Sequence, residues 1–126
     1  MRAVDTNILV RLFMRDDAAQ AEIAEEFIER GAWVSHVVLV EAMWTLRTSY
    51  ALDHAEIARI IAMLLEHQQL VVHDADVISA ALDDYRRKPA LGFSDCLILE
   101  IAKKAGHVPL GTFDKALGKV DGTEAL

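Results

Sequence analysis

The sequence changes from strand character to helix character within one apolar stretch, residues 33–44, which reads WVSHVVLVEAMW. Residues 33–35 have the aromatic and β-branched composition of a short strand. The valine-rich residues that follow also suit a strand by composition. A spacing of three to four residues, which is typical of a helix, relates the apolar side chains of Val37, Val40, Met43 and Trp44. We therefore predict a helix that begins near His36 and takes Ser35 as its N-cap.

Short apolar runs and longer amphipathic segments alternate in both directions from this stretch. Strands are predicted at residues 3–4, 33–35, 70–72 and 108–110. Periodicity and capping residues predict helices at about 7–13, 18–30, 36–47, 53–65, 75–88 and 94–105, and one helical turn at 114–117. Strands separated by helices need crossover connections, which produce a parallel sheet flanked by helices. The sequence therefore predicts an α/β protein, and leaves open whether residues 117–126 add a fifth strand.

Helix starts can be predicted from capping residues at several places. Asp5 or Thr6 suits the N-cap of the first helix. Asp53, followed three residues later by Glu56, has the pattern of a capping box. Ser94 is predicted to cap the last long helix.

Composition excludes several classes of protein. The chain has 126 residues, of which 53% are hydrophobic and 26% charged, so we expect one folded domain, residues 1–126, rather than a disordered chain. No apolar run approaches the roughly 18 residues of a membrane helix, and residues 1–5 do not resemble a signal peptide. The single cysteine, Cys96, cannot form an internal disulfide. These features predict a cytoplasmic protein that does not bind a membrane.

The net charge of −7 argues against binding of nucleic acid by charge alone, but acids gathered in one place could hold cations. Asp5 directly follows the first strand, Asp95 lies in the first turn of a helix, and Asp114 follows the fourth strand. Each also suits a plainer role as a cap or as an acid favoured by the helix dipole. Glu41 differs, because it lies in an apolar helix, where an uncompensated buried carboxylate costs several kcal/mol.

A shared site would explain all four acids. Ligands bind beyond the carboxyl ends of the strands in parallel sheets, which is where we expect Asp5, Asp95 and Asp114 to lie. Clustered carboxylates raise one another's pKa unless a cation is present, and oxygen ligands suit hard cations such as Mg²⁺ or Mn²⁺. Such a cation can orient water, lower its pKa and neutralise the charge of a phosphodiester.

These residues resemble the PIN-domain nucleases, and most of all the VapC toxins of toxin–antitoxin pairs. The resemblance covers essentially the whole chain, and the order and spacing of the acids contribute to it. It is carried by Val4-Asp5-Thr6-Asn7-Ile8-Leu9, the lone Glu41, Phe93-Ser94-Asp95-Cys96-Leu97-Ile98 and Thr112-Phe113-Asp114.

The resemblance implies a PIN-like three-layer sandwich with a parallel sheet of four or five strands. It also implies an acidic pocket for Mg²⁺ or Mn²⁺ and hydrolysis of RNA by metal-activated water, leaving a 5′-phosphate and a 3′-hydroxyl. The four acids would bind the metal, and Asp5 and Asp95 would be the direct ligands. Hydrogen bonding to the site would come from Asn7, Ser94 and Thr112. A homodimer is expected, with a cognate VapB-type antitoxin whose C-terminal segment covers the acids.

Two other functions fit parts of the sequence. One is a catalytically silent PIN-like module that binds RNA or protein, and the other is a metal-dependent phosphatase or a phosphoryl-accepting domain. The five histidines are scattered in sequence and predict surface or capping roles. Trp33 and Trp44 lie in apolar runs, which favours packing or interface roles over stacking on bases.

Overall fold

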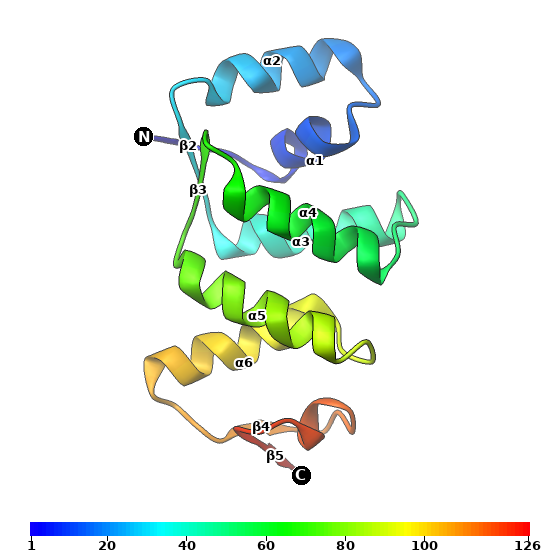
Figure 1. The fold of residues 1–126 in the computed structure, drawn as a ribbon, viewed down its shortest axis with the longest axis vertical. Coiled ribbons are helices and arrows are strands. Elements are labelled where there is room, and N and C mark those ends of the chain that lie inside the picture. Colours follow the sequence, from blue (N-terminus) through cyan, green and yellow to red (C-terminus); the bar gives the residue numbers. More distant parts are fainter. The chain divides into compact units, whose positions relative to one another are not determined.

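The computed structural model describes residues 1–126, and the chain divides into two compact units, Met1–Ala75 and Asp76–Leu126. Each unit contains helices and a parallel sheet of its own (Figure 1). The first unit has the element order β1 (Arg2–Ala3), α1 (Thr6–Met14), α2 (Ala18–Ile28), β2 (Ala32–Val34), α3 (His36–Thr48), α4 (His54–Glu66) and β3 (Leu70–Val72). The second has α5 (Ala75–Arg87, beginning at the unit boundary), α6 (Phe93–Ala105), β4 (Leu110–Thr112), the short 3₁₀ helix η1 (Leu117–Lys119) and β5 (Thr123–Ala125).

The sheet of the first unit has the order β1-β2-β3, with Ala3 opposite Trp33 and Trp33 opposite Val71. Both pairings are parallel, so the carboxyl ends of the three strands share one edge. Helix α1 packs against α2 and α3, and α4 packs against α3 and β3. The core of this unit is aliphatic, and its fully buried side chains include Leu9, Val34, Leu39, Leu46, Ile61 and Leu64.

Each helix of the first unit begins with a side-chain cap. Asp5 caps α1, Asp17 caps α2, Ser35 caps α3 and Asp53 caps α4, each by accepting a hydrogen bond from the backbone N–H three residues later. Asp53 and Glu56 complete a capping box in both directions. The predicted caps Ser35 and Asp53 are confirmed, and the choice between Asp5 and Thr6 is resolved in favour of Asp5.

In the second unit, β4 and β5 pair in parallel, and Leu110 lies opposite Thr123. The aromatic rings of Tyr85 on α5 and Phe93 on α6 meet edge to face, with centroids 5.9 Å apart. Ile78 and Leu99 are also buried. Helix α6 ends at Gly106, which adopts the left-handed conformation (φ 81°) that suits a glycine C-cap.

The α/β class and the parallel pairing predicted from the sequence are confirmed, and the chain does form a fifth strand after Leu117. The prediction of one sheet is not matched, because the strands pair as a group of three and a group of two. Strand β4 also lies two residues later than predicted. Pro109 has no N–H for the ladder, and the first ladder donor is the N–H of Leu110, which bonds to the carbonyl of Gly122.

The start of α6 differs from the prediction as well. Ser94 was expected to be its N-cap, but the N-cap is Gly92, and it makes no side-chain capping bond. Phe93 is buried against Tyr85, so the helix begins one residue before Ser94 and places the serine in the exposed first turn. No helix in the chain combines the length and the apolar character that crossing a membrane requires.

Candidate functional site

At the start of α1, Thr6, the residue after Asp5, contacts Glu41. Asp5 follows β1, and its Oδ1 accepts the Ile8 N–H at 3.2 Å. The hydroxyl of the next residue, Thr6, donates to Oε2 of Glu41 on α3 at 2.8 Å. Capping and cation binding are therefore compatible, because each carboxylate keeps a second oxygen that these bonds do not use.

The burial predicted for Glu41 is wrong. Helix α3 turns Leu39, Ala42, Met43 and Leu46 into the core, and Glu41 lies on the opposite, exposed face. Val37 and Trp44 lie on that face too, and each is 68% exposed. The apolar neighbours of Glu41 in sequence therefore do not remove it from water, and the cost of burial is no argument for a cation at this residue. Its bond to Thr6, beside Asp5, is the observation that relates it to a site.

Asp95 and Asp114 form a second pair, within the second unit. Asp95 lies in the first turn of α6 and is partly buried. Burial raises the pKa of its carboxyl group, and the negative charge of Asp114 raises that pKa further. Asp114 accepts the Leu117 N–H through Oδ1 at 2.8 Å, which again leaves one oxygen for another partner.

The three residues predicted to support the acids differ in what they contact. Thr112 accepts the backbone N–H of Asp114 through its hydroxyl at 3.0 Å, so it does position an acid. Asn7 and Ser94 are exposed neighbours of Asp5 and Asp95 in sequence. The contact of Thr6 with Glu41 was not predicted, although the position of Thr6 directly after Asp5 could have suggested it.

The donor set consists of carboxylate oxygens, which are the ligands that Mg²⁺ and Mn²⁺ prefer. A cation beside Asp95 and Asp114 would offset the repulsion by which Asp114 raises the pKa of Asp95. In neither unit do three or more His, Cys, Asp or Glu side chains gather in a way that could hold a metal ion. Within each unit, two of the predicted acids offer carboxylate oxygens of the kind that suit a hard cation.

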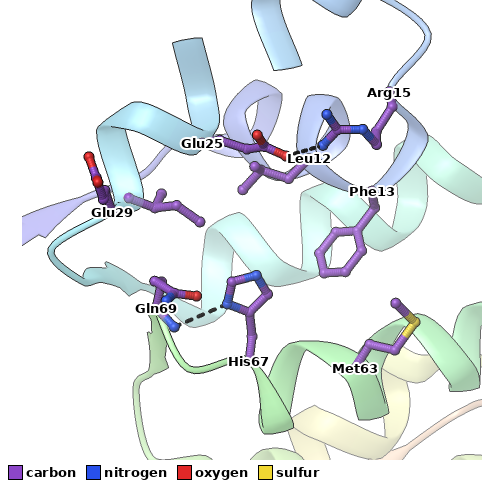
Figure 2. A pocket seen from close by; sticks show the side chains of 9 residues that line it. Leu12, Phe13, Arg15, Glu25, Glu29, Met63, His67 and Gln69 are labelled. Carbon is purple, nitrogen blue, oxygen red and sulfur yellow. Dashed lines mark hydrogen bonds and ion pairs between the residues drawn. The ribbon is translucent and has the colours of Figure 1, made fainter. Parts of the chain in front are cut away.

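A cavity of about 510 Å³ lies elsewhere in the first unit, beside α1, α2 and the end of α4 (Figure 2). Phe13, Met63 and His67 reach into it, and an ion pair between Arg15 and Glu25 lies at its rim (Figure 2). The remaining lining residues are Leu12, Ile28, Glu29 and Gln69. The four acids are not part of its lining, so this cavity is separate from the candidate acidic site.

Comparison with known families identifies the chain. The model of the PIN domain family matches residues 2–123, which is nearly the entire chain and includes residues of both units. The chain therefore belongs to the PIN domain family, whose members are generally nucleases. No curated protein and no solved structure shows a significant match to it.

Proposed function

We propose that the chain is a metal-dependent endoribonuclease of the VapC type, the toxin of a toxin–antitoxin pair, acting in the cytoplasm. The observation that carries this proposal is the pairing of acids in a PIN-domain chain. Thr6, which follows Asp5 in the chain, donates to Glu41, and the charge of Asp114 raises the pKa of the Asp95 carboxyl group.

Each acid has a specific role in this proposal. Asp5, Glu41, Asp95 and Asp114 bind Mg²⁺ or Mn²⁺, with Asp5 and Asp95 as direct ligands. The bound cation supplies Lewis acidity, which lowers the pKa of a water molecule and neutralises charge on the phosphodiester. Thr6 holds the Glu41 carboxylate in one orientation, and Thr112 holds the backbone of Asp114.

Cleavage of single-stranded and hairpin RNA tests the proposal. We expect cleavage with Mg²⁺ or Mn²⁺, none with EDTA, and losses of at least about a hundredfold in Asp5→Asn and Asp95→Asn, which keep side-chain size but remove the charge. Asp83→Asn is a matched control, because Asp83 is an exposed acid of α5. Equal cleavage by all variants would contradict the assignment of the acids.

Calorimetric titration with Mn²⁺ separates an enzyme from a catalytically silent module. The nuclease is expected to bind the ion, and Asp5→Asn and Asp95→Asn are expected to bind it more weakly. A chain that binds RNA but neither Mn²⁺ nor Mg²⁺ would be the silent module. Hydrolysis of small phosphomonoesters without cleavage of RNA would indicate a phosphatase.

The antitoxin and the homodimer belong to the same proposal. A VapB-type partner whose C-terminal segment covers the acids would suppress both cleavage and Mn²⁺ binding. Co-expression with the neighbouring reading frame is expected to relieve growth arrest caused by this chain, and light scattering is expected to give twice the 14.0 kDa mass of one chain. Growth arrest that no neighbouring reading frame relieves would contradict the toxin assignment.

A further inference from the structure

Three aromatic rings gather where β2 and β3 end, at the carboxyl edge of the first unit's sheet. The ring of His73 lies 5.6 Å from that of Trp33, in an edge-to-face arrangement, and 5.1 Å from that of His36. His36 is the first residue of α3, and His73 directly follows β3. We call Trp33, His36 and His73 the ring cluster. The histidines are scattered in sequence, but His36 and His73 each stand within two residues of a strand end.

The backbone fixes these rings. The His73 N–H donates to the carbonyl of Val34 at 3.0 Å, which continues the β2–β3 ladder by one residue. Nε2 of His36 lies 2.7 Å from the carbonyl oxygen of His73. A carbonyl oxygen can only accept, so Nε2 of His36 carries the hydrogen. The cluster is thus held by main-chain bonds before any ligand arrives, which reduces the entropy that binding would cost.

The cluster is open to solvent. The side chain of His73 is 53% exposed, and Trp33 and His36 are half-buried. Aromatic rings that are held rigidly and left partly open are the usual platforms for unpaired bases of RNA, because every base has a face that can stack.

The charges around the cluster favour a base over a phosphate group. Asp74 lies beside the cluster, and its Oδ2 is 3.6 Å from Nε2 of His73. A carboxylate repels a phosphate but does not repel an uncharged base, which can stack on the ring faces.

The cluster also lies at the same sheet edge as Asp5. The Val4 N–H donates to the carbonyl of Trp33 at 3.1 Å, so Asp5 follows β1 at the edge where His73 follows β3. Only β2 separates these strands. Two strand spacings of about 4.8 Å place the backbone of His73 roughly 10 Å from that of Asp5, and Trp33, on β2, is one strand closer.

We propose that the ring cluster of Trp33, His36 and His73 binds an unpaired base of the RNA substrate by stacking, and so selects single-stranded sites near the cleaved bond. This inference rests on the proposed nuclease function. Trp33 packs against His73 and supports it, while the exposed ring of His73 contacts the base.

Binding of a fluorescent single-stranded RNA hexamer tests the inference without catalysis. In an Asp95→Asn background, which prevents cleavage, His73→Ala is expected to weaken binding about 5- to 150-fold, the range for loss of one stacked base. His73→Phe keeps a ring face and is expected to restore most of the affinity. His107→Ala, which removes an exposed histidine of the second unit, is the matched control.

Hexamers with one abasic position provide a measurement in which the base, rather than the protein, is altered. One abasic position is expected to weaken binding to the unsubstituted ring cluster by the same factor as His73→Ala, and to have little further effect in His73→Ala. If His73→Phe binds as weakly as His73→Ala, the imidazole nitrogens bind a cation or a phosphate instead, and the inference is wrong. Unchanged binding by His73→Ala would also overturn it.

These outcomes are distinct from failure of the proposed function. A chain that cleaves RNA but binds normal and abasic hexamers equally would retain the nuclease function and lose the stacking site. A chain that shows the stacking pattern but never cleaves RNA would retain the site and lose the nuclease function.

Discussion

At the scale of single residues, burial and a neighbouring acid both raise the pKa of the Asp95 carboxyl group. Burial is the larger cause of its raised pKa, and the charge of Asp114 is the smaller. Asp114→Asn removes the charge but keeps an oxygen for the Leu117 N–H. We expect this variant to lower the pKa of Asp95 without restoring its ordinary value. Carboxyl NMR titration without divalent ions measures the change, and an unchanged pKa would contradict the proximity of the two acids.

A different pair of acids, Asp84 and Glu100, lies between α5 and α6. Asp84 is buried, its Oδ1 accepts from Arg87 at 3.0 Å, and its Oδ2 has no donor. Burial raises the pKa of Glu100, and hydrogen bonding to Asp84 and the charge of Asp84 raise it further, while Lys103, 3.3 Å away, opposes this. A protonated Glu100 can donate to Asp84, whereas two ionised carboxylates repel each other.

The contribution of Glu100 to the stability of the second unit should therefore fall as pH rises. A group whose pKa is higher in the folded chain contributes fully below its ordinary pKa, which is 4.5 for Glu100, and this contribution is lost as pH rises through the folded pKa. Glu100→Gln keeps a donor for Asp84 at every pH. The free energy of unfolding of Glu100→Gln should increase relative to that of the unsubstituted chain as pH rises from 4.5. Urea unfolding measures this difference. Glu22→Gln, at an exposed acid of α2, is the control. A difference that does not vary with pH would contradict the shared proton.

At the scale of secondary-structure elements, α4 has the most complete local signal. Asp53 accepts the Glu56 N–H at 2.8 Å, and the Glu56 side chain accepts the Asp53 N–H at 3.1 Å. Asp53→Ala leaves the first-turn donors unsatisfied, and we expect it to lower the free energy of unfolding by about 1 kcal/mol. Urea unfolding measures this. Glu66→Ala, at the exposed last residue of α4, should change it by less than about 0.5 kcal/mol.

The elements also show what local sequence can predict. Ser35 and Asp53 were predicted as caps because a cap is a contact between residues three apart. Ser94 was assigned wrongly because the start of α6 depends on the contact of Phe93 with Tyr85, eight residues away. Glu41 was placed in the right helix but on the wrong face, because an apolar run of α3 that continues onto an exposed face looks the same in sequence as a buried one.

The pairing of strands is harder to predict from the sequence than the positions of the strands. Leu70–Val72 was predicted at its observed bounds, and the fold class follows from the alternation of strands and helices. Which strands bond to one another depends on contacts far apart in the chain, such as Ala3 with Trp33, and this is where the predicted single sheet differs from the two observed sheets. The ring cluster was missed for the same reason, since His36 and His73 are 37 residues apart.

At the scale of the whole molecule, binding of cations to the four candidate acids would change the net charge of the chain. The chain has 20 acidic and 13 basic residues, so 16 acids would remain against 13 bases if the four candidate acids were neutralised by cations. More than half of the acidic excess is then concentrated in two carboxylate pairs. A cation that neutralises them favours the folded chain, because unfolding would separate the members of each pair.

Thermal unfolding should therefore respond to the valence of the cation rather than to ionic strength alone. A ligand that binds only the folded chain stabilises it by about 2.7 kcal/mol at a hundred times its Kd, which corresponds to a rise in Tm of several degrees for a domain of this size. We expect Mn²⁺ or Mg²⁺ to raise Tm, and NaCl at matched ionic strength to raise it less. Asp5→Asn and Asp95→Asn should reduce the response to the divalent ion, while Asp83→Asn should not. If NaCl raises Tm as much as Mg²⁺ does, the acids are only screened, and the charge of the chain would give no support to a metal site.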